Sequence, residues 1–342
     1  MKFGTVILWR DSYQDYVEEL RAAERLGMDL VGAGDTQASY RELYVSLTVA
    51  ALNTERVLVG PMVTNPVTRH PAVTASAMGA VDRLSAGRAV MGIGTGGSAV
   101  WNAGLPPARI DDFREYLETL RSLVRTGRAT YRGSEVLVEG IEREFPILVS
   151  AEGPRSLRLA GALADGVILH AGTSRQAVEW CRQRIAEGAG QAGRDPGQIE
   201  LWMMLKAAVA DTREAALEEV RMGLAGSAEH ALRTGAAEKG VPPELLEPIA
   251  ELVARYDASQ HAKAGNANGD LVERLGLTDF LADFFGLVGT PEECAERLRT
   301  LQSYGISGVV SPALGSSPIE LITRLGREVL PLLGNDDRAL AS

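Results

Sequence analysis

The chain has 342 residues, of which 45% are hydrophobic and 23% are charged, and its formal net charge is −10 at pH 7. This length and composition are enough to bury a large core, either as one barrel-sized domain or as two ordinary domains. The acidic balance, with a pI near 5.1, argues against a nucleic-acid partner or an anionic membrane partner and favours a small-molecule partner.

The ends and the cysteines of the chain exclude further classes of protein. The first sixteen residues hold an apolar run that is too short for a signal peptide, and no later window approaches the roughly 20 apolar residues of a membrane span. We therefore expect a cytoplasmic protein. Cys181 and Cys294 lie far apart in helix-like segments, so we predict two buried thiols rather than a disulfide or a metal site.

Short apolar runs alternate with segments of helical period along the whole chain, which is the pattern of repeated βα units around a parallel sheet. Eight runs are predicted strands: residues 2–9, 29–34, 56–64, 88–94, 146–150, 166–170, 199–209 and 307–312. Eight such units predict an α/β protein with a (β/α)8 barrel, formed as a single domain over residues 1–342. A doubly wound sheet followed by a second domain is the alternative.

Two segments interrupt the alternation. Residues 129–140 alternate like a hairpin before the fifth strand. Residues 226–285, after the seventh strand and its helix, form a long insertion of short helical pieces with polar joints. Insertions of this length are usually functional, so we predict a lid or a dimer element, and disordered filler is the alternative.

The residues that follow each strand are the ones to examine, because barrel enzymes place their active sites at the carboxyl ends of the strands. These residues are unusually polar or rich in glycine. The second run ends at Asp35, the third at Thr64 and Asn65, and the fourth leads into a glycine-rich loop at residues 94–98. We predict that these strand ends face a common cleft.

Asp35 and His170 are the candidate catalytic residues. Asp35 could orient a substrate or carry a proton, although an aspartate at this position is also an ordinary helix N-cap. His170, which ends the sixth strand, could donate a proton or bind a cofactor ring, or it could be a half-buried histidine paired with backbone. Arg69 and His70 begin the third predicted helix and are interpreted as structural.

The glycine-rich loop is a weak signal by itself. Its glycines permit close approach of a ligand to free backbone amides, but the spacing matches neither a Walker loop nor the dinucleotide fingerprint, and tight structural turns are the alternative. Two further strand-to-helix junctions, at residues 150–156 and 171–174, carry small residues and hydroxyls that could hold a phosphate. No metal site is predicted from the histidines or cysteines.

Three segments in order resemble the luciferase-like superfamily of flavin-type oxidoreductases. They are VGPMVTNPVTRHPAVTASAMGAVDRLSAGRAVMGIGTGGS, PILVSAEGPRSLRLAGALADGVIL and GTPEECAERLRTLQSYGISGVV. Within that superfamily they are most similar to the branch of methylenetetrahydromethanopterin reductase, which uses the deazaflavin coenzyme F420. The resemblance spans nearly the whole chain and implies a TIM-type barrel, usually as a homodimer, with a flavin-like ring at the strand ends.

The resemblance also implies particular site residues. It places a non-prolyl cis peptide at Met62 to Val63, facing the coenzyme ring, and it places Asp35 near the reactive face of the ring. The implied cofactor-binding residues are Met62, Val63, Thr64, Asn65, Gly94, Thr95, Gly96, Gly97, Ser98, Ala151, Glu152, Gly153, Ala171, Gly172 and Thr173. One departure is the stretch GGSAV, where many relatives carry a charged residue.

These features predict hydride transfer between coenzyme F420 and a small organic substrate. The alternative is an FMN-dependent monooxygenase that uses reduced flavin and oxygen, and a non-catalytic flavin-binding protein is less favoured. Monooxygenase relatives often place a histidine where this chain has Asp35, which favours F420.

Overall fold

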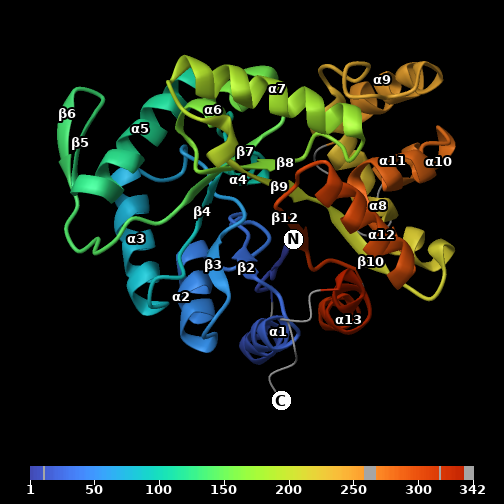
Figure 1. The fold of residues 1–342 in the computed structure, drawn as a ribbon, viewed down its shortest axis with the longest axis horizontal. Coiled ribbons are helices and arrows are strands. Elements are labelled where there is room, and N and C mark those ends of the chain that lie inside the picture. Colours follow the sequence, from blue (N-terminus) through green and yellow to red (C-terminus); the bar gives the residue numbers. More distant parts are fainter. Residues whose placement is uncertain (11, 258–266, 316, 335–342) are drawn as a thin grey trace.

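The computed structural model describes residues 1–10, 12–257, 267–315 and 317–334, and its centre is a closed parallel barrel (Figure 1). Eight parallel strands pair in the order β3-β2-β1-β12-β9-β8-β7-β4. The bridges Val59 to Ala89 and Thr64 to Ile93 join β3 to β4 and complete the circle. The strands are β1 (Lys2–Val6), β2 (Leu30–Ala33), β3 (Leu58–Pro61), β4 (Met91–Ile93), β7 (Ile147–Ala151), β8 (Gly166–Leu169), β9 (Glu200–Met204) and β12 (Gly308–Pro312). The predicted barrel is confirmed, and the doubly wound alternative is wrong.

Helices surround the barrel and begin at residues suited to cap them. Ser12, Ser174 and Thr290 each accept a hydrogen bond from a backbone amide of the following first turn. The helices around the barrel are α1 (Tyr13–Arg25), α2 (Leu43–Asn53), α3 (Pro71–Leu84), α4 (Ser98–Asn102), α5 (Ile110–Thr126), α6 (Pro154–Leu163), α7 (Arg175–Gln191), α8 (Arg213–Leu232), α12 (Pro291–Ser303) and α13 (Pro318–Arg324). The short 3-10 helices are η1 (Pro196–Gln198), η2 (Pro243–Leu245) and η5 (Leu330–Leu333), and η4 (Leu325–Val329) is a π-helix.

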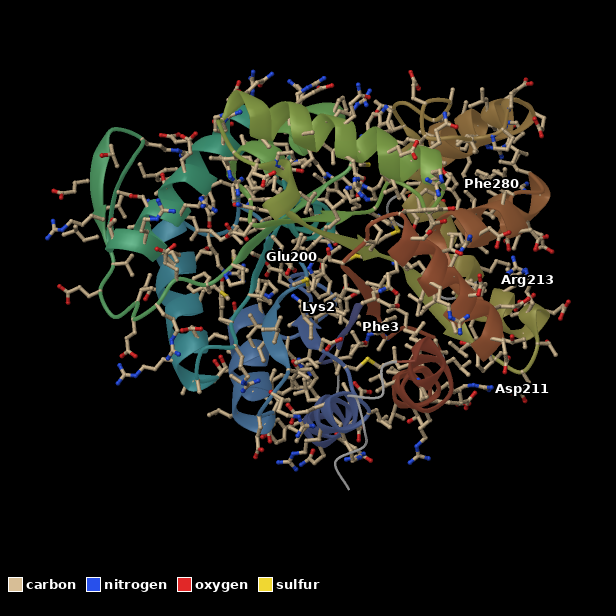
Figure 2. All side chains as sticks on the ribbon, viewed as in Figure 1. Lys2, Phe3, Glu200, Asp211, Arg213 and Phe280 are labelled. Atoms are coloured by element: carbon tan, nitrogen blue, oxygen red, sulfur yellow. The ribbon has the colours of Figure 1, made fainter. Side chains whose placement is uncertain are left out.

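The interior of the barrel is filled by large side chains, as in a packed core rather than a pore. Trp202 of β9 is 2% exposed and lies against Gly308, where a Cβ would stand 2.6 Å from the indole ring. Below it, the amine of Lys2 donates to Glu200 at 2.9 Å, and Figure 2 shows these two side chains beside each other. The amino-terminal end of the barrel is therefore closed, which leaves the carboxyl-terminal end for a ligand.

A second apolar layer lies between the strands and the outer helices. It includes Cys181 and Cys294, which are both 1% exposed, and burial raises the pKa of each thiol to about 12. The prediction of two buried thiols is confirmed. The close approach of α6 to α7 requires Gly161 and Gly188, because a Cβ on either would clash with a backbone carbonyl of the other helix.

The seventh predicted strand, residues 199–209, is in fact two strands. Its pairing with β12 ends at Met204 opposite Val310, and the hydroxyl of Ser311 accepts the amide of Ala207. The chain then continues as β10 (Lys206–Val209), which pairs in parallel with β11 (Gly286–Gly289) outside the barrel. The prediction of one strand was wrong, because the apolar run continues past the point at which the pairing partner changes from β12 to β11.

The helical segment after the seventh strand is confirmed. Helix α8 crosses residue 226 without a break, and it is followed by α9 (Leu246–Arg255), α10 (Ala267–Arg274) and α11 (Thr278–Phe285). These helices bury an apolar cluster of their own against α8, and Figure 1 shows them gathered on one side of the barrel. Residues 258–266 of the predicted insertion lie outside the described residues.

The predicted hairpin is also confirmed, as the antiparallel strands β5 (Arg128–Tyr131) and β6 (Ser134–Leu137).

Throughout the described ranges, no helix is long and apolar enough to cross a membrane.

The α6–α7 contact yields a stability prediction. Gly188→Ala is expected to lower the free energy of unfolding by about 1–3 kcal/mol, because the added methyl overpacks the helix crossing. Gly190→Ala, on the same helix but in open space, is expected to raise it by about 0.5–1 kcal/mol. Urea unfolding of both variants checks this, and equal changes would show that the close approach is not real.

Candidate active site

A large cleft of about 1190 Å³ opens at the carboxyl ends of the barrel strands. Its size suits a cofactor together with a small substrate. The predicted site residues that line it are Asp35, Met62, Val63, Thr64, Asn65, Gly94, Thr95, Gly96, Gly97, Ser98, Glu152, Gly153 and His170. The predicted convergence of the strand ends on one cleft is therefore observed.

The peptide between Met62 and Val63 is cis, as the resemblance predicts. Glycines on both neighbouring strands leave room for this part of β3. A Cβ on Gly32 would lie 2.6 Å from Met62 Cγ, and a Cβ on Gly92 would clash with the carbonyl oxygen of Pro61. Thr64 then rejoins the barrel, because its amide donates to Gly92 and its carbonyl accepts from Gly94, each at 3.0 Å.

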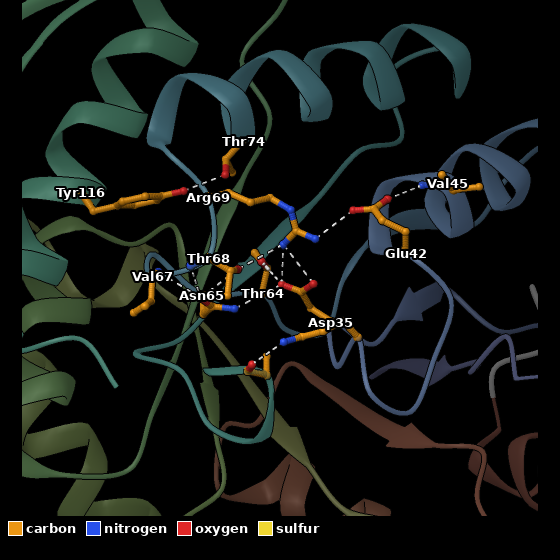
Figure 3. A network of polar contacts seen from close by, with 12 residues as sticks. Asp35, Glu42, Val45, Thr64, Asn65, Val67, Thr68, Arg69, Thr74 and Tyr116 are labelled. Atoms are coloured by element: carbon orange, nitrogen blue, oxygen red, sulfur yellow. Dashed lines mark hydrogen bonds and ion pairs between the residues drawn. The ribbon is translucent and has the colours of Figure 1, made fainter. Parts of the chain in front are cut away.

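The carboxylate of Asp35 is the centre of a dense polar network (Figure 3). It accepts from the Thr64 hydroxyl at 2.5 Å and from the Asn65 amide at 3.3 Å. The Arg69 Nη1 donates to both of its oxygens, at 3.0 and 2.8 Å. The side chain of Asp35 is only 6% exposed, so these contacts leave little of the carboxylate to the cleft.

Asn65 fixes the exit of the chain from β3. Its side-chain oxygen accepts from the amides of Val67 and Thr68, at 3.0 and 2.9 Å. This is the turn that an asparagine followed by a proline favours. The chain is thereby directed into α3, whose N-cap His70 accepts from the amide of Ala72, so the structural interpretation of His70 is confirmed.

The glycine-rich loop presents backbone to the cleft. Gly96 has φ +108°, a conformation that favours glycine, and no atom lies within 4 Å of a Cβ built on Gly97. The loop is held by side chains from the β2 end, since the hydroxyls of Thr36 and Ser98 are 2.8 Å apart. The loop thus offers open amides on a fixed support.

His170 and Glu152 face each other across the other side of the cleft. Their closest atoms, His170 Nδ1 and Glu152 Oε1, are 3.4 Å apart. Burial favours the neutral carboxyl of Glu152, but His170 and the more distant charges of His230 and Lys239 outweigh it and lower its pKa. His170 Nε2 is buried and has no hydrogen-bond partner among the described residues, so this nitrogen is available to a ligand.

Four predicted cofactor-binding residues, Ala151, Ala171, Gly172 and Thr173, do not line the cleft. Gly172 packs so closely on Phe284 that a Cβ would clash with the ring, and the Thr173 hydroxyl donates to the carbonyl of Asp283 at 2.7 Å. Helix α11 therefore occupies the space that the resemblance reserved for a ligand beside residues 171–173. Their role in binding stays a prediction that this geometry does not support.

The structure adds cleft residues that the sequence reasoning missed. Arg155, at the start of α6, and Lys206, at the start of β10, both line the cleft, and neither side chain has a hydrogen-bond or ion-pair partner within the described part of the chain. Burial lowers the pKa of Lys206. A lysine within an otherwise apolar strand was the signal that could have identified this residue.

The inserted region reaches the cleft only through α8. That helix and the residues directly after it contribute Glu218, Glu219, Val220, Gly223, His230, Arg233 and Thr234. Trp101 of α4 stacks on His230 with ring centroids 5.6 Å apart, which links the glycine loop to α8. Within residues 235–257 and 267–285, no side chain lines the cleft, because α9, α10 and α11 pack on α8 instead.

A closed parallel barrel with one large cleft at its carboxyl end, lined by glycine loops and a few buried polar groups, defines a TIM-barrel enzyme. The sequence profile of the luciferase-like monooxygenases matches residues 1–308. The chain belongs to this family.

Similar proteins carry more specific names. The chain is 30% identical to the 5,10-methylenetetrahydromethanopterin reductase of Methanolobus tindarius, over 96% of this chain and all of that protein. It is 31% identical to an F420-dependent glucose-6-phosphate dehydrogenase of Beutenbergia cavernae, over 93% of each chain. Its fold matches the coenzyme F420-dependent tetrahydromethanopterin reductase of Methanopyrus kandleri with a TM-score of 0.79 at 25% identity, covering 96% and 98% of the two chains.

The lowered pKa of Glu152 yields a pH prediction. Because the folded state holds this carboxylate ionised more strongly than the unfolded chain does, the interaction stabilises the fold above the ordinary glutamate pKa of about 4.3 and is lost as the pH falls through the folded value. Glu152→Gln is expected to lose less stability than the wild type between pH 7 and about pH 3. Urea unfolding across this range is the measurement. Glu179→Gln, in an exposed pair, is the control and should follow the wild type.

Proposed function

We propose that the protein is an oxidoreductase that transfers a hydride between coenzyme F420 and a small organic substrate. The observation that carries the proposal is full-length similarity to two differently named groups of enzymes, a reductase and a dehydrogenase, that share F420. Met62 and Val63, where the resemblance places the coenzyme ring, line the cleft, which supports the same assignment.

The residues of the cleft fit such a coenzyme. Arg155 and the start of α6 offer a cation and free amides to a phosphate, as do the open amides around Gly97. The unpartnered Nε2 of His170 suits a polar atom of a ring or a substrate. Met62 and Val63 offer an apolar wall for the flat ring. The cleft therefore combines a polar anchor with an apolar platform.

When bound, F420 supplies the hydride donor or acceptor. The protein residues then orient the reactants and manage the accompanying proton. We assign proton exchange first to His170, because its Nε2 has no partner within the described residues, whereas the oxygens of Asp35 are already engaged. Asp35 supplies a fixed negative charge at the wall beside the cis peptide.

The alternatives have less support. Two of the three relatives described above are named for F420 and none for FMN, so reduced-FMN monooxygenation is the second candidate and non-catalytic flavin binding is third. A cytoplasmic location and the lack of a nucleic-acid or membrane partner remain predictions from the sequence.

We also propose that the protein is a homodimer that pairs through α2 and α3, which lie side by side (Figure 1). Helix α2 is apolar on nearly all sides, and a helix of that kind is normally buried on all sides. Val45 and Leu52 of α2 are 53% and 63% exposed, and Val73 of α3 is 55% exposed. A second copy of the chain would cover these side chains.

Cofactor binding tests the proposed function directly. In titrations followed by protein fluorescence, F420 is expected to bind at least tenfold more tightly than FMN. With reduced FMN, oxygen uptake linked to a substrate is not expected. Tight FMN binding with substrate-linked oxygen consumption, and no detectable F420 binding, would overturn the assignment and favour a monooxygenase.

The dimer proposal is tested by Leu52→Glu, which should convert a dimer into a monomer at micromolar concentration, because the buried charge would lack a partner. Leu137→Glu, at a comparably exposed leucine on the hairpin, should leave the mass unchanged. Light scattering after size-exclusion chromatography gives the mass. A monomeric wild type would show that the exposed apolar face serves another purpose.

A further inference from the structure

The structure gives Arg69 a role beyond starting a helix. Its guanidinium joins two carboxylates, since Nη1 contacts both oxygens of Asp35 and Nη2 donates to Glu42 Oε1 at 2.8 Å. Arg69 does not line the cleft, whereas Asp35 does. Figure 3 shows Arg69 reaching from the start of α3 to Asp35 at the end of β2, with Glu42 on its far side.

Each end of this arrangement is attached to a rigid element. Glu42 is the N-cap of α2, and its second oxygen accepts from the amide of Val45 at 3.0 Å. Arg69 lies over the ring of Tyr44, with 5.1 Å between the guanidinium carbon and the ring centroid. Asp35 is tied through Thr64 to the strand end beside the cis peptide. A continuous chain of contacts therefore runs from α2 to the wall of the cleft.

The charges of the group reinforce one another. Burial disfavours the charged form of Arg69, but the hydrogen bonds and negative charges of Asp35 and Glu42 outweigh this effect and raise its pKa. Among the described residues, the other titratable groups beside Arg69 are phenols, Tyr44 of α2 and, through Thr74, Tyr116 of α5. Burial raises the pKa of both, so Arg69 is the cation that balances Asp35.

We propose that Arg69 is a positioning residue that holds Asp35 ionised and fixed at the cleft wall, with Glu42 as the anchor on its far side. The inference deepens the proposed function, since Asp35 is the charge placed beside the coenzyme ring. Thr64 and Asn65 are neutral donors, and without Arg69 they leave a nearly buried carboxylate with no counter-charge.

The test uses the purified protein without coenzyme. Infrared spectra of protein labelled with ¹³C-aspartate follow the protonation of Asp35 with pH, and Asp35→Asn identifies the band. In Arg69→Met, Asp35 is expected to take up its proton at least about one pH unit higher than in the wild type, a tenfold change in proton affinity. Arg83→Met, at an exposed ion pair of the same helix, is the control and should match the wild type. An unchanged Asp35 titration in Arg69→Met would overturn the proposal.

The double variant Asp35→Asn with Arg69→Met decides the case in which Arg69→Met does not fold. If the lone buried charge is the cause, removing both charges restores folding, and this outcome supports the proposal. If the double variant also fails to fold, Arg69 has a general structural role and the proposal is wrong.

A second readout is the affinity for F420. Asp35→Asn and the double variant are expected to show equal dissociation constants, within about a factor of two, because Arg69 acts through Asp35 and its removal adds nothing once that carboxylate is gone. A double variant that binds F420 more weakly than Asp35→Asn would contradict the proposal. A wild type that does not bind F420 would overturn the proposed function, and the infrared titration would still decide the role of Arg69.

Discussion

The candidate site depends on the hydrogen bonds and the ion pair that the Asp35 carboxylate makes. The carboxylate joins the end of β2 to Thr64 at the end of β3 and to Arg69 at the start of α3. These contacts cross from one βα unit to the next, at the point where the barrel holds a cis peptide between Met62 and Val63. A buried carboxylate is stable only with donors and a counter-charge, so the cleft wall and the helices behind it form one unit.

This dependence explains why polar residues end an apolar strand. The backbone of Thr64 makes hydrogen bonds within the barrel, and its hydroxyl donates to the carboxylate of Asp35. The side chain of Asn65 closes the turn that leads into α3. The neighbouring strands contribute glycines rather than side-chain contacts, because Gly32 and Gly92 leave space for the side chains and backbone of residues 61–63. The same few residues thus shape the cleft and stabilise the strand end.

The barrel was predictable because the apolar period of each strand and helix can be recognised within its own segment of sequence. Features that depend on partners far along the chain could not be predicted in this way. Residues 199–209 form a single apolar run, yet β10 leaves the barrel to pair with β11, about 80 residues later. The loop at residues 171–173 has the composition of a phosphate site, yet Phe284 of α11 packs against it. The roles of Arg69 and Lys206 were not predictable, because they depend on the contact of Arg69 with Asp35 and on the position of Lys206 at the cleft.

The central claim is that the coenzyme ring rests on the Met62–Val63 wall that Asp35 and Arg69 support. A crystal structure of the protein with F420 tests it most directly. The account predicts the ring against the Met62–Val63 peptide, the phosphate near the amides of residues 95–98 and Arg155, and an intact contact between Asp35 and Arg69. A ring bound against α8, with its phosphate away from these amides, would contradict it.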